Sequence, residues 1–418
     1  MKFTKEVTPT ENQTKEHQSN PSNLVTLIVQ RIRNIGISLV KDGAIVHWLG
    51  RISTIIFCSL YVLQFKAILS AKDDRLFECI SEMTFCGMGI LKLISLYRNH
   101  KHWNFLINAV SELEKEELSN EESFDKYEKD DDVEFTFSYH IVSYTAEFKT
   151  VSTVLARIYG FTAIIYVLSP FLEYGFLKDT REDGWPHILP IWPPFDHLSF
   201  SGYLFTILLE FIAAVFCVFV HVAFDLTAVG FMIFICGQFV LLRQYSQSIG
   251  GNGRQLQLSR KRDERAHHRI ARCHKIYERL MIASHVLSTL LKNILGVYFF
   301  VATVTLCSVA IRLNSYQEMS SMQLVSLAQY MCATLTQLFL FCYYGDNILE
   351  KSSVNQGEGP FGAAHWCLSP QVREELAMLG LGMMMPRHFY AGPFTSLDLP
   401  SFIQVVKTAY SYYAVIRN

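Results

Sequence analysis

Seven long apolar runs alternate with polar stretches along the 418 residues of the chain. A helix needs about 20 mostly apolar residues to cross the hydrocarbon core of a bilayer. The runs therefore predict an all-α, polytopic membrane protein with seven transmembrane helices. The predicted spans cover residues 52–68 (with a start as early as 44), 76–97, 151–174, 201–242, 284–313, 322–349 and 399–416. The second span contains Glu78, Glu82 and Lys92, so we expect it to face other helices rather than lipid.

Lys and Arg are concentrated in two polar segments, 31–51 and 243–279. An even number of spans separates these segments, and the positive-inside rule puts both in the cytosol, with the N-terminus inside and the C-terminus outside. Residues 98–149 should then be cytosolic as well, although acidic residues dominate 112–134. We expect this acidic run to be a solvated helix or loop; a regulatory contact is the alternative.

The spans and loops give the chain a definite order of segments. In sequence they are a cytosolic N-terminal segment (1–43), helices one to four (44–242, with the acidic extension 98–149 and an external loop 175–200), a basic cytosolic loop or helix (243–283), helices five and six (284–349), a cytosolic helical element (350–390) and the last helix (391–418).

The composition fits a membrane protein and gives no support for an enzyme. Only 18% of the residues are charged, against about 25% in soluble domains, and the net charge of −1 does not suggest nucleic-acid binding. The motifs of phosphate loops, dinucleotide sites, zinc proteases and serine hydrolases are missing, so we expect no cofactor and no metal. His221 and Asp225 lie four residues apart on the fourth span; we interpret them as a structural hydrogen-bonded pair, with a gating or ion-pathway role as the alternative.

Seven spans also occur in G-protein-coupled receptors, but the sequence does not favour that class. The predicted topology is inverted, and no cysteine lies between Cys86 and Cys217 to form their usual external disulfide. The DRY and NPxxY motifs are missing too. A metabotropic receptor is therefore a less favoured alternative. A transporter is also less favoured, because no repeated halves with broken helices are visible in the sequence.

The last predicted helix carries a polar stripe on an otherwise apolar surface. Gln404, Thr408, Ser411, Val415 and Asn418 follow one another at steps of four and three residues, which places them on one helical face. Such a stripe needs either a protein partner or water. It either lines a pore formed with other subunits or packs inside one subunit. In a pore, Val415 would form a ring of apolar groups that can gate by dewetting.

The C-terminal run PFTSLDLPSFIQVVKTAYSYYAVIRN resembles the sequence that ends insect odorant receptors. The run FLFCYYGDNILEKSS, and Trp366 ahead of a VREEL-type helix, resemble their sixth span and the cytosolic element that follows it. The chain length, the cytosolic N-terminus and the long fourth span followed by a basic loop are also similar. The resemblance extends over essentially the whole chain, but its specific motifs lie in the last hundred residues.

This resemblance implies a tetrameric, nonselective cation channel in the plasma membrane of olfactory sensory neurons, opened directly by odorants. The last helices of four subunits would line the pore, and residues 265–285 and 345–385 would contribute to an intersubunit anchor. By the same resemblance Val415 holds the gate position, with Ser411, Tyr412 and Thr408 below it. The residue that forms the outermost pore ring, near Asn418, is not assigned by this resemblance, because some relatives extend further.

The resemblance also separates two kinds of subunit. The co-receptor shared by these receptors has a long insertion between the fourth and fifth spans, whereas this loop is only SQSIGGNGRQLQLSRKRDE. We therefore expect an odorant-tuning subunit that forms a heterotetramer with the co-receptor and passes permeant cations across the bilayer. A gustatory-type receptor is the near alternative, but its usual TY-then-QF ending is missing.

For the ligand, the resemblance implies a pocket in the outer half of each subunit, between the second and the sixth span. Mapping by depth gives ten candidates, Ile80, Met83, Thr84, Tyr159, Thr162, Tyr166, Phe205, Leu208, Phe299 and Thr303. Apolar and aromatic walls with a few hydroxyls suit a small hydrophobic volatile. The alternative for each residue is ordinary packing between helices.

Overall fold

The computed structural model describes residues 24–34, 44–70, 73–124, 137–176, 185–191, 200–251, 253, 257–314 and 321–417. Within them the chain is almost entirely helical, and the expected all-α fold is confirmed. The elements are α1 (Leu24–Asn34), α2 (Ala44–Ser70), α3 (Asp73–Arg98), α4 (His100–Phe124), α5 (Phe137–Phe176), α6 (Phe200–Gln247), α7 (Arg260–Asn314), α8 (Ser321–Ser352), η2 (Gly359–Gly362), η3 (His365–Cys367), α9 (Pro370–Met383), β1 (Tyr390–Ala391), β2 (Thr395–Ser396) and α10 (Leu399–Arg417).

Six helices in the described part of the chain are long and apolar enough to cross a membrane. They lie within Trp48–Leu69, Cys79–Arg98, Phe137–Leu172, Phe200–Gln247, Arg260–Leu313 and Gln323–Ser352. Their outer faces carry large exposed apolar side chains such as Ile55, Phe161 and Leu204, which lipid accommodates and water does not. The seventh expected span, α10, forms a 19-residue helix but is not among the six, and its polar stripe is one reason.

Two helices begin well before their predicted spans. We expected the third span from residue 151 and the fifth from 284, whereas α5 begins at Phe137 and α7 at Arg260. The basic segment 243–283 is therefore largely helical. Its polar composition hides an apolar face, because Ala266, Ile270 and Cys273 are buried at helical spacing. A transmembrane pattern marks only the part of such a helix that crosses lipid.

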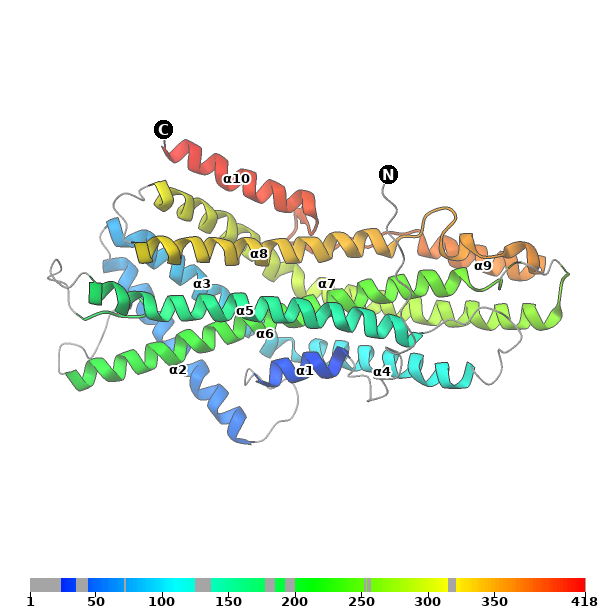
Figure 1. Ribbon diagram of the computed structural model, residues 1–418, viewed down its shortest axis with the longest axis horizontal. Coiled ribbons are helices and arrows are strands. Elements are labelled where there is room, and N and C mark those ends of the chain that lie inside the picture. Colours follow the sequence, from blue (N-terminus) through cyan, green and yellow to red (C-terminus); the bar gives the residue numbers. More distant parts are fainter. Residues whose placement is uncertain are drawn as a thin grey trace.

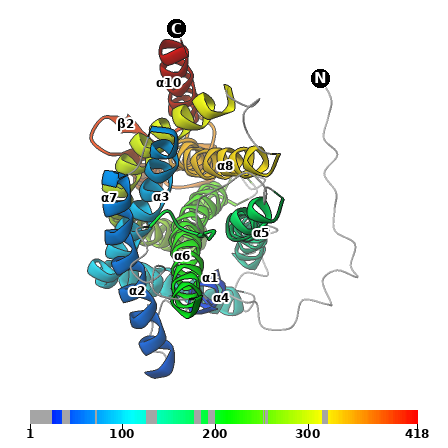
Figure 2. The ribbon, with the colours of Figure 1, turned by 90° about the vertical axis from the view of Figure 1, so that its left-hand side faces the viewer.

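The helices form an elongated bundle around α6 (Figure 1). Seen along its length, α6 lies in the middle, with α2, α3, α7, α8 and α5 around it (Figure 2). This position follows from the sequence of α6, which is apolar on all sides and is buried almost continuously between residues 220 and 236. A helix without a polar face is stable only where other helices surround it.

The base of α10 is held by α7 and α8. A two-stranded antiparallel hairpin precedes α10, with Tyr390 opposite Ser396, and the Gly392 N–H donates to the Lys292 carbonyl of α7 at 2.7 Å. A Cβ on Gly296 would lie 2.6 Å from the Gly392 Cα. Gly345 of α8 likewise lies against the backbone of Leu397, just before α10. Only glycine allows this close backbone approach.

Candidate functional site

A cavity lies between α3, α5, α6, α7 and α8, inside the part of the bundle that crosses the membrane. It offers about 50 Å³ to the centre of a water-sized molecule, and the atom-free space in and around it, open solvent included, is about 570 Å³. Apolar and aromatic side chains form most of its wall, with hydroxyl, amide and imidazole groups between them. The lining residues are Phe85, Met88, Tyr159, Thr162, Val218, His221, Tyr298, Val301, Ala302, Thr305, Tyr330, Ala333, Thr334 and Gln337.

Two of the ten ligand residues chosen from the sequence, Tyr159 and Thr162, line this cavity. Phe205 and Leu208 are 52% and 55% exposed and lie on the outer surface of α6. The remaining six lie on α3, α5 and α7 without lining the cavity; they are Ile80, Met83, Thr84, Tyr166, Phe299 and Thr303. The ten-residue assignment as a whole stays a prediction.

The differences between the predicted ligand residues and the residues that line the cavity have a simple geometric cause. Successive residues of a helix point about 100° apart, so a depth estimate that is wrong by one residue selects the wrong face. Thr84 is next to the lining residue Phe85, and Phe299 is next to Tyr298. No residue of α8 was chosen, although Tyr330 and Gln337 line the cavity. Polar and aromatic positions inside the apolar run of α8 were the available signal.

A buried charged network lies at one side of the cavity. The Lys92 Nζ of α3 donates to Asp225 Oδ1 of α6 at 2.7 Å, and both side chains are 1% exposed. The same Nζ lies 3.0 Å from His221 Nδ1. The hydroxyl of Tyr159 and the Nε2 of Gln337 donate to Asp225 Oδ2 at 2.5 and 2.8 Å. Side chains from α3, α5, α6 and α8 thus meet on one carboxylate.

This network corrects one expectation and confirms another. His221 and Asp225 do not form the expected direct pair, because Lys92 lies between them and contacts both. Lys92 itself is buried, which confirms that the second span turns its charge towards protein. A buried ion pair is costly to desolvate and needs several hydrogen bonds to be stable. The carboxylate of Asp225 accepts three.

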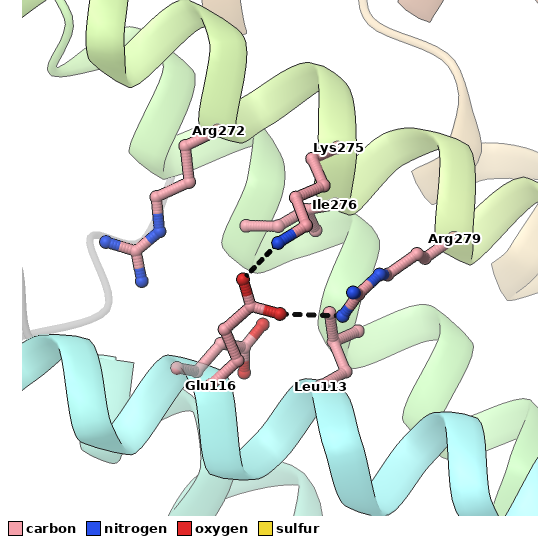
Figure 3. Close-up of a pocket in the computed structure, with 7 residues that line it drawn as sticks. Leu113, Glu116, Arg272, Lys275, Ile276 and Arg279 are labelled. Atoms are coloured by element: carbon pink, nitrogen blue, oxygen red, sulfur yellow. Dashed lines mark hydrogen bonds and ion pairs between the residues drawn. The ribbon is translucent and has the colours of Figure 1, made fainter.

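A second polar cluster joins α4 to α7 at the other end of the bundle, outside the predicted spans. The carboxylate of Glu116 accepts from Lys275 Nζ and from Arg279 Nη1, each at 2.6 Å (Figure 3). The hydrogen bond from Lys275 lowers the pKa of Glu116. Beside this triad is a cavity of about 10 Å³ for the centre of a water-sized molecule, lined also by Glu117 and Arg272. It has room for about one water.

Two further carboxyl groups of α4 are buried in the protein. Glu114 and Glu117 are 0% and 1% exposed, so the acidic run is not solvated here as expected. The Tyr144 hydroxyl donates to Glu114 Oε1 at 2.8 Å, and Gln238 Nε2 donates to Glu117 Oε2 at 3.1 Å. Burial raises the pKa of Glu114 to about 7 and the pKa of Glu117 to about 8. The rest of the run, from residue 125, lies outside the described residues.

The striped face of α10 is uncovered in the single chain. Val415 is 73% exposed, and Gln404 and Ser411 are exposed as well, whereas Thr408 is half-buried. Opposite the stripe, Val405 and Ala409 are buried, towards α7 and α8. The remaining pore candidates are Tyr412, which is 57% exposed, and Asn418, which lies outside the described residues.

These features define a multi-pass, α-helical membrane protein with a cavity between five of its helices. The sequence profile of the family described as 7tm Odorant receptor matches residues 76–410. The chain therefore belongs to the odorant receptor family, which is a receptor family rather than an enzyme family. The expected family membership is confirmed.

Curated relatives match with low identity and over part of their length. Odorant receptor 13a of Drosophila melanogaster is 24% identical over 269 residues, which is 61% of this chain and 63% of the relative. Odorant receptor Or2 of Anopheles gambiae is 20% identical over 146 residues, 35% of this chain and 38% of the relative. The alignments thus span less than two thirds of these relatives.

Solved structures match over nearly the whole chain. The insect olfactory receptor OR5 from Machilis hrabei superposes with a TM-score of 0.67 at 16% identity, covering 94% of this chain and 97% of that protein. The same receptor in complex with eugenol gives a TM-score of 0.66 at 15% identity, covering 94% and 96%. At this identity the likeness shows the fold.

Proposed function

We propose that this chain is an odorant-gated, nonselective cation-channel subunit that binds a small volatile in the cavity and opens a pore lined by α10 together with a co-receptor. The cavity carries the proposal. It is lined by five membrane helices, and its wall is mostly apolar and aromatic with a few polar groups, as in small-molecule sites. The structurally similar receptor OR5 was solved in complex with eugenol, which supports a ligand role for the family fold.

The ligand is expected to be compact and largely apolar. Met88, Val218 and Val301 provide apolar surface, and the aromatic rings of Phe85 and Tyr330 give it shape. Shape and one or two hydrogen bonds would then set the specificity, as is usual for pockets of this kind. The ligand would reach its site from the outer side of an olfactory neuron membrane.

The uncovered stripe of α10 supports a pore formed by several subunits. Four copies around an axis would turn Gln404, Ser411 and Val415 towards a common channel, and Val415 would be the apolar gate. No acidic ring or carbonyl filter occurs along this helix, so weak selectivity among cations is expected. The N-terminus and the basic start of α7 would lie in the cytosol.

Subunits would meet mainly at the cytosolic end, through parts of residues 265–285 and 345–385. In the described part of the chain, α9 and the residues after it expose Met378, Leu381 and Met385. These side chains lie beyond the six candidate spans, where lipid would not cover them. An apolar surface outside the membrane is typical of a protein interface.

The test is whole-cell current in cells that express this chain with and without an insect co-receptor, screened with a panel of volatiles. We expect a rapid cation current that needs both subunits. Ala302→Leu should weaken the response by filling the cavity, whereas Val304→Leu, on the outer face of the same helix, should not. Odorant responses that depend on G proteins, without a direct current, would refute the channel function.

A further inference from the structure

The two helices that hold the base of α10 also form a wall of the cavity. On α7, Tyr298 lines the cavity, and Gly296 lies against the hairpin before α10. On α8, Gln337 lines the cavity, and Gly345 packs against the backbone just before α10. These two positions of α8 are about 12 Å apart along one straight helix. A movement of α8 at the cavity therefore reaches the base of α10 directly.

The contact between α8 and α10 continues beyond this base. The rings of Phe339 and Phe402 meet edge to face, with centroids 5.7 Å apart. Phe339 is two residues after Gln337, on the side of α8 that faces α10 rather than the cavity. This pair adds a side-chain contact between α8 and α10 to the backbone contact at Gly345.

Gln337 is also the group that ties α8 to the charged network. Its Nε2 donates to Asp225 Oδ2 at 2.8 Å. Asp225 keeps two other donors, Lys92 of α3 and Tyr159 of α5. Loss of the Gln337 bond therefore leaves the carboxylate paired and hydrogen-bonded, so this bond can open at modest cost, whereas loss of Lys92 would leave a bare buried charge.

Resting on the proposed channel function, we propose that the Gln337–Asp225 hydrogen bond is a latch that holds α8 in the ligand-free, closed arrangement. A ligand in the cavity displaces the Gln337 side chain, α8 shifts away from α5 and α6, and the base of α10 moves with it. Gln337 is then a positioning residue that acts on the pore through α8. The ligand shifts the equilibrium because it competes with the latch only in the closed state.

The experiment compares Gln337→Met with Thr336→Val in cells that also express a co-receptor. Methionine keeps the length of the side chain and removes the donor. Thr336 is the matched control, since its hydroxyl bonds only to Cys332 of its own helix at 2.8 Å. The readouts are ligand-free current per surface copy and the half-maximal concentration of an active volatile. Should Gln337→Met fail to reach the surface, Gln337→Asn, whose amide is too short to reach Asp225, replaces it.

We expect Gln337→Met to raise the ligand-free current about tenfold and to lower the half-maximal concentration, because a hydrogen bond to a charged group is worth about one power of ten in a two-state equilibrium. Thr336→Val should match the wild type. A merely structural role, or direct ligand contact alone, would not raise the ligand-free current. Wild-type odorant responses with an unchanged ligand-free current in Gln337→Met would overturn the latch alone. A wild type that gives no current with any volatile would instead count against the channel function.

Discussion

Raising the pH from about 6 to about 8 should destabilise the folded chain, because two buried carboxyl groups keep protons that the unfolded chain releases. Burial raises the pKa of Glu114 to about 7 and that of Glu117 to about 8, whereas an unfolded glutamate has a pKa of about 4.3. In this window the folded chain holds protons that the unfolded chain has released. The contribution of these two groups to the free energy of unfolding is therefore complete below about pH 4.3. It is lost as the pH rises through their pKa values in the folded chain.

The magnitude follows from the linkage relation. Each proton held by the folded chain alone costs about 1.4 kcal/mol per pH unit. Between about pH 6 and about pH 8, Glu117 stays mostly protonated and lowers the free energy of unfolding by about 2 kcal/mol. Glu114 ionises midway and lowers it by about 1 kcal/mol. Tyr144, Gln238 and the nearby Arg272 face these carboxyls from α5, α6 and α7. These groups favour the ionised form of the carboxyl that they face and so lower its pKa, but burial raises the pKa by more.

Thermal unfolding of the purified, detergent-solubilised chain at several pH values measures this effect. The melting temperature of the wild type should fall between about pH 6 and about pH 8, and Glu117→Gln, a neutral isostere, should remove more than half of the fall. Glu116→Gln is the control on the same helix, because the Lys275 hydrogen bond lowers the pKa of Glu116 and keeps it ionised throughout. The reasoning fails if Glu117→Gln keeps the wild-type pH dependence.

Three further outcomes test the bundle and the pore. Lys92→Met should lower stability by about 3–5 kcal/mol because it leaves Asp225 buried and unpaired, and Asp225→Leu in the same chain should restore part of the loss; thermal unfolding measures both. Gly345→Val should force α8 away from the backbone at Leu397 and abolish the odorant current at normal surface density, as surface labelling with recording can establish. Val415→Ala should widen the proposed gate and raise the ligand-free current; unchanged recordings would argue against a gate there.

The sequence predicts the membrane helices well because an apolar run is a local property. Each predicted span lies inside an observed helix, and the central place of α6 follows from its apolar sequence alone. The errors lie where a helix leaves the membrane. There the pattern changes from all-apolar to amphipathic, as in α7 from Arg260 onwards. A hydropathy pattern ends at that change although the helix continues.

Burial of charge could not be predicted in the same way. Glu114 and Glu117 belong to a run that resembles a solvated surface, and their burial depends on Tyr144 and Gln238 from other helices. The cavity is likewise a property of five helices together, so the choice of lining residues needs their rotation about their own axes. A single sequence does not contain that rotation in any local pattern.

The buried polar contacts fix the rotation and register of the helices, which the apolar pattern does not determine. Apolar faces in lipid can slide and rotate against one another with little change in energy, because lipid tails solvate them about as well as a neighbouring helix does. A buried carboxylate cannot, since its donors must lie at hydrogen-bond distance or the charge is left bare. Asp225 therefore fixes the register of α3, α5 and α8 against α6. Because Lys92 and Tyr159 still keep the carboxylate paired, Gln337, the one amide among the donors to Asp225, is the contact that can open without leaving the charge bare.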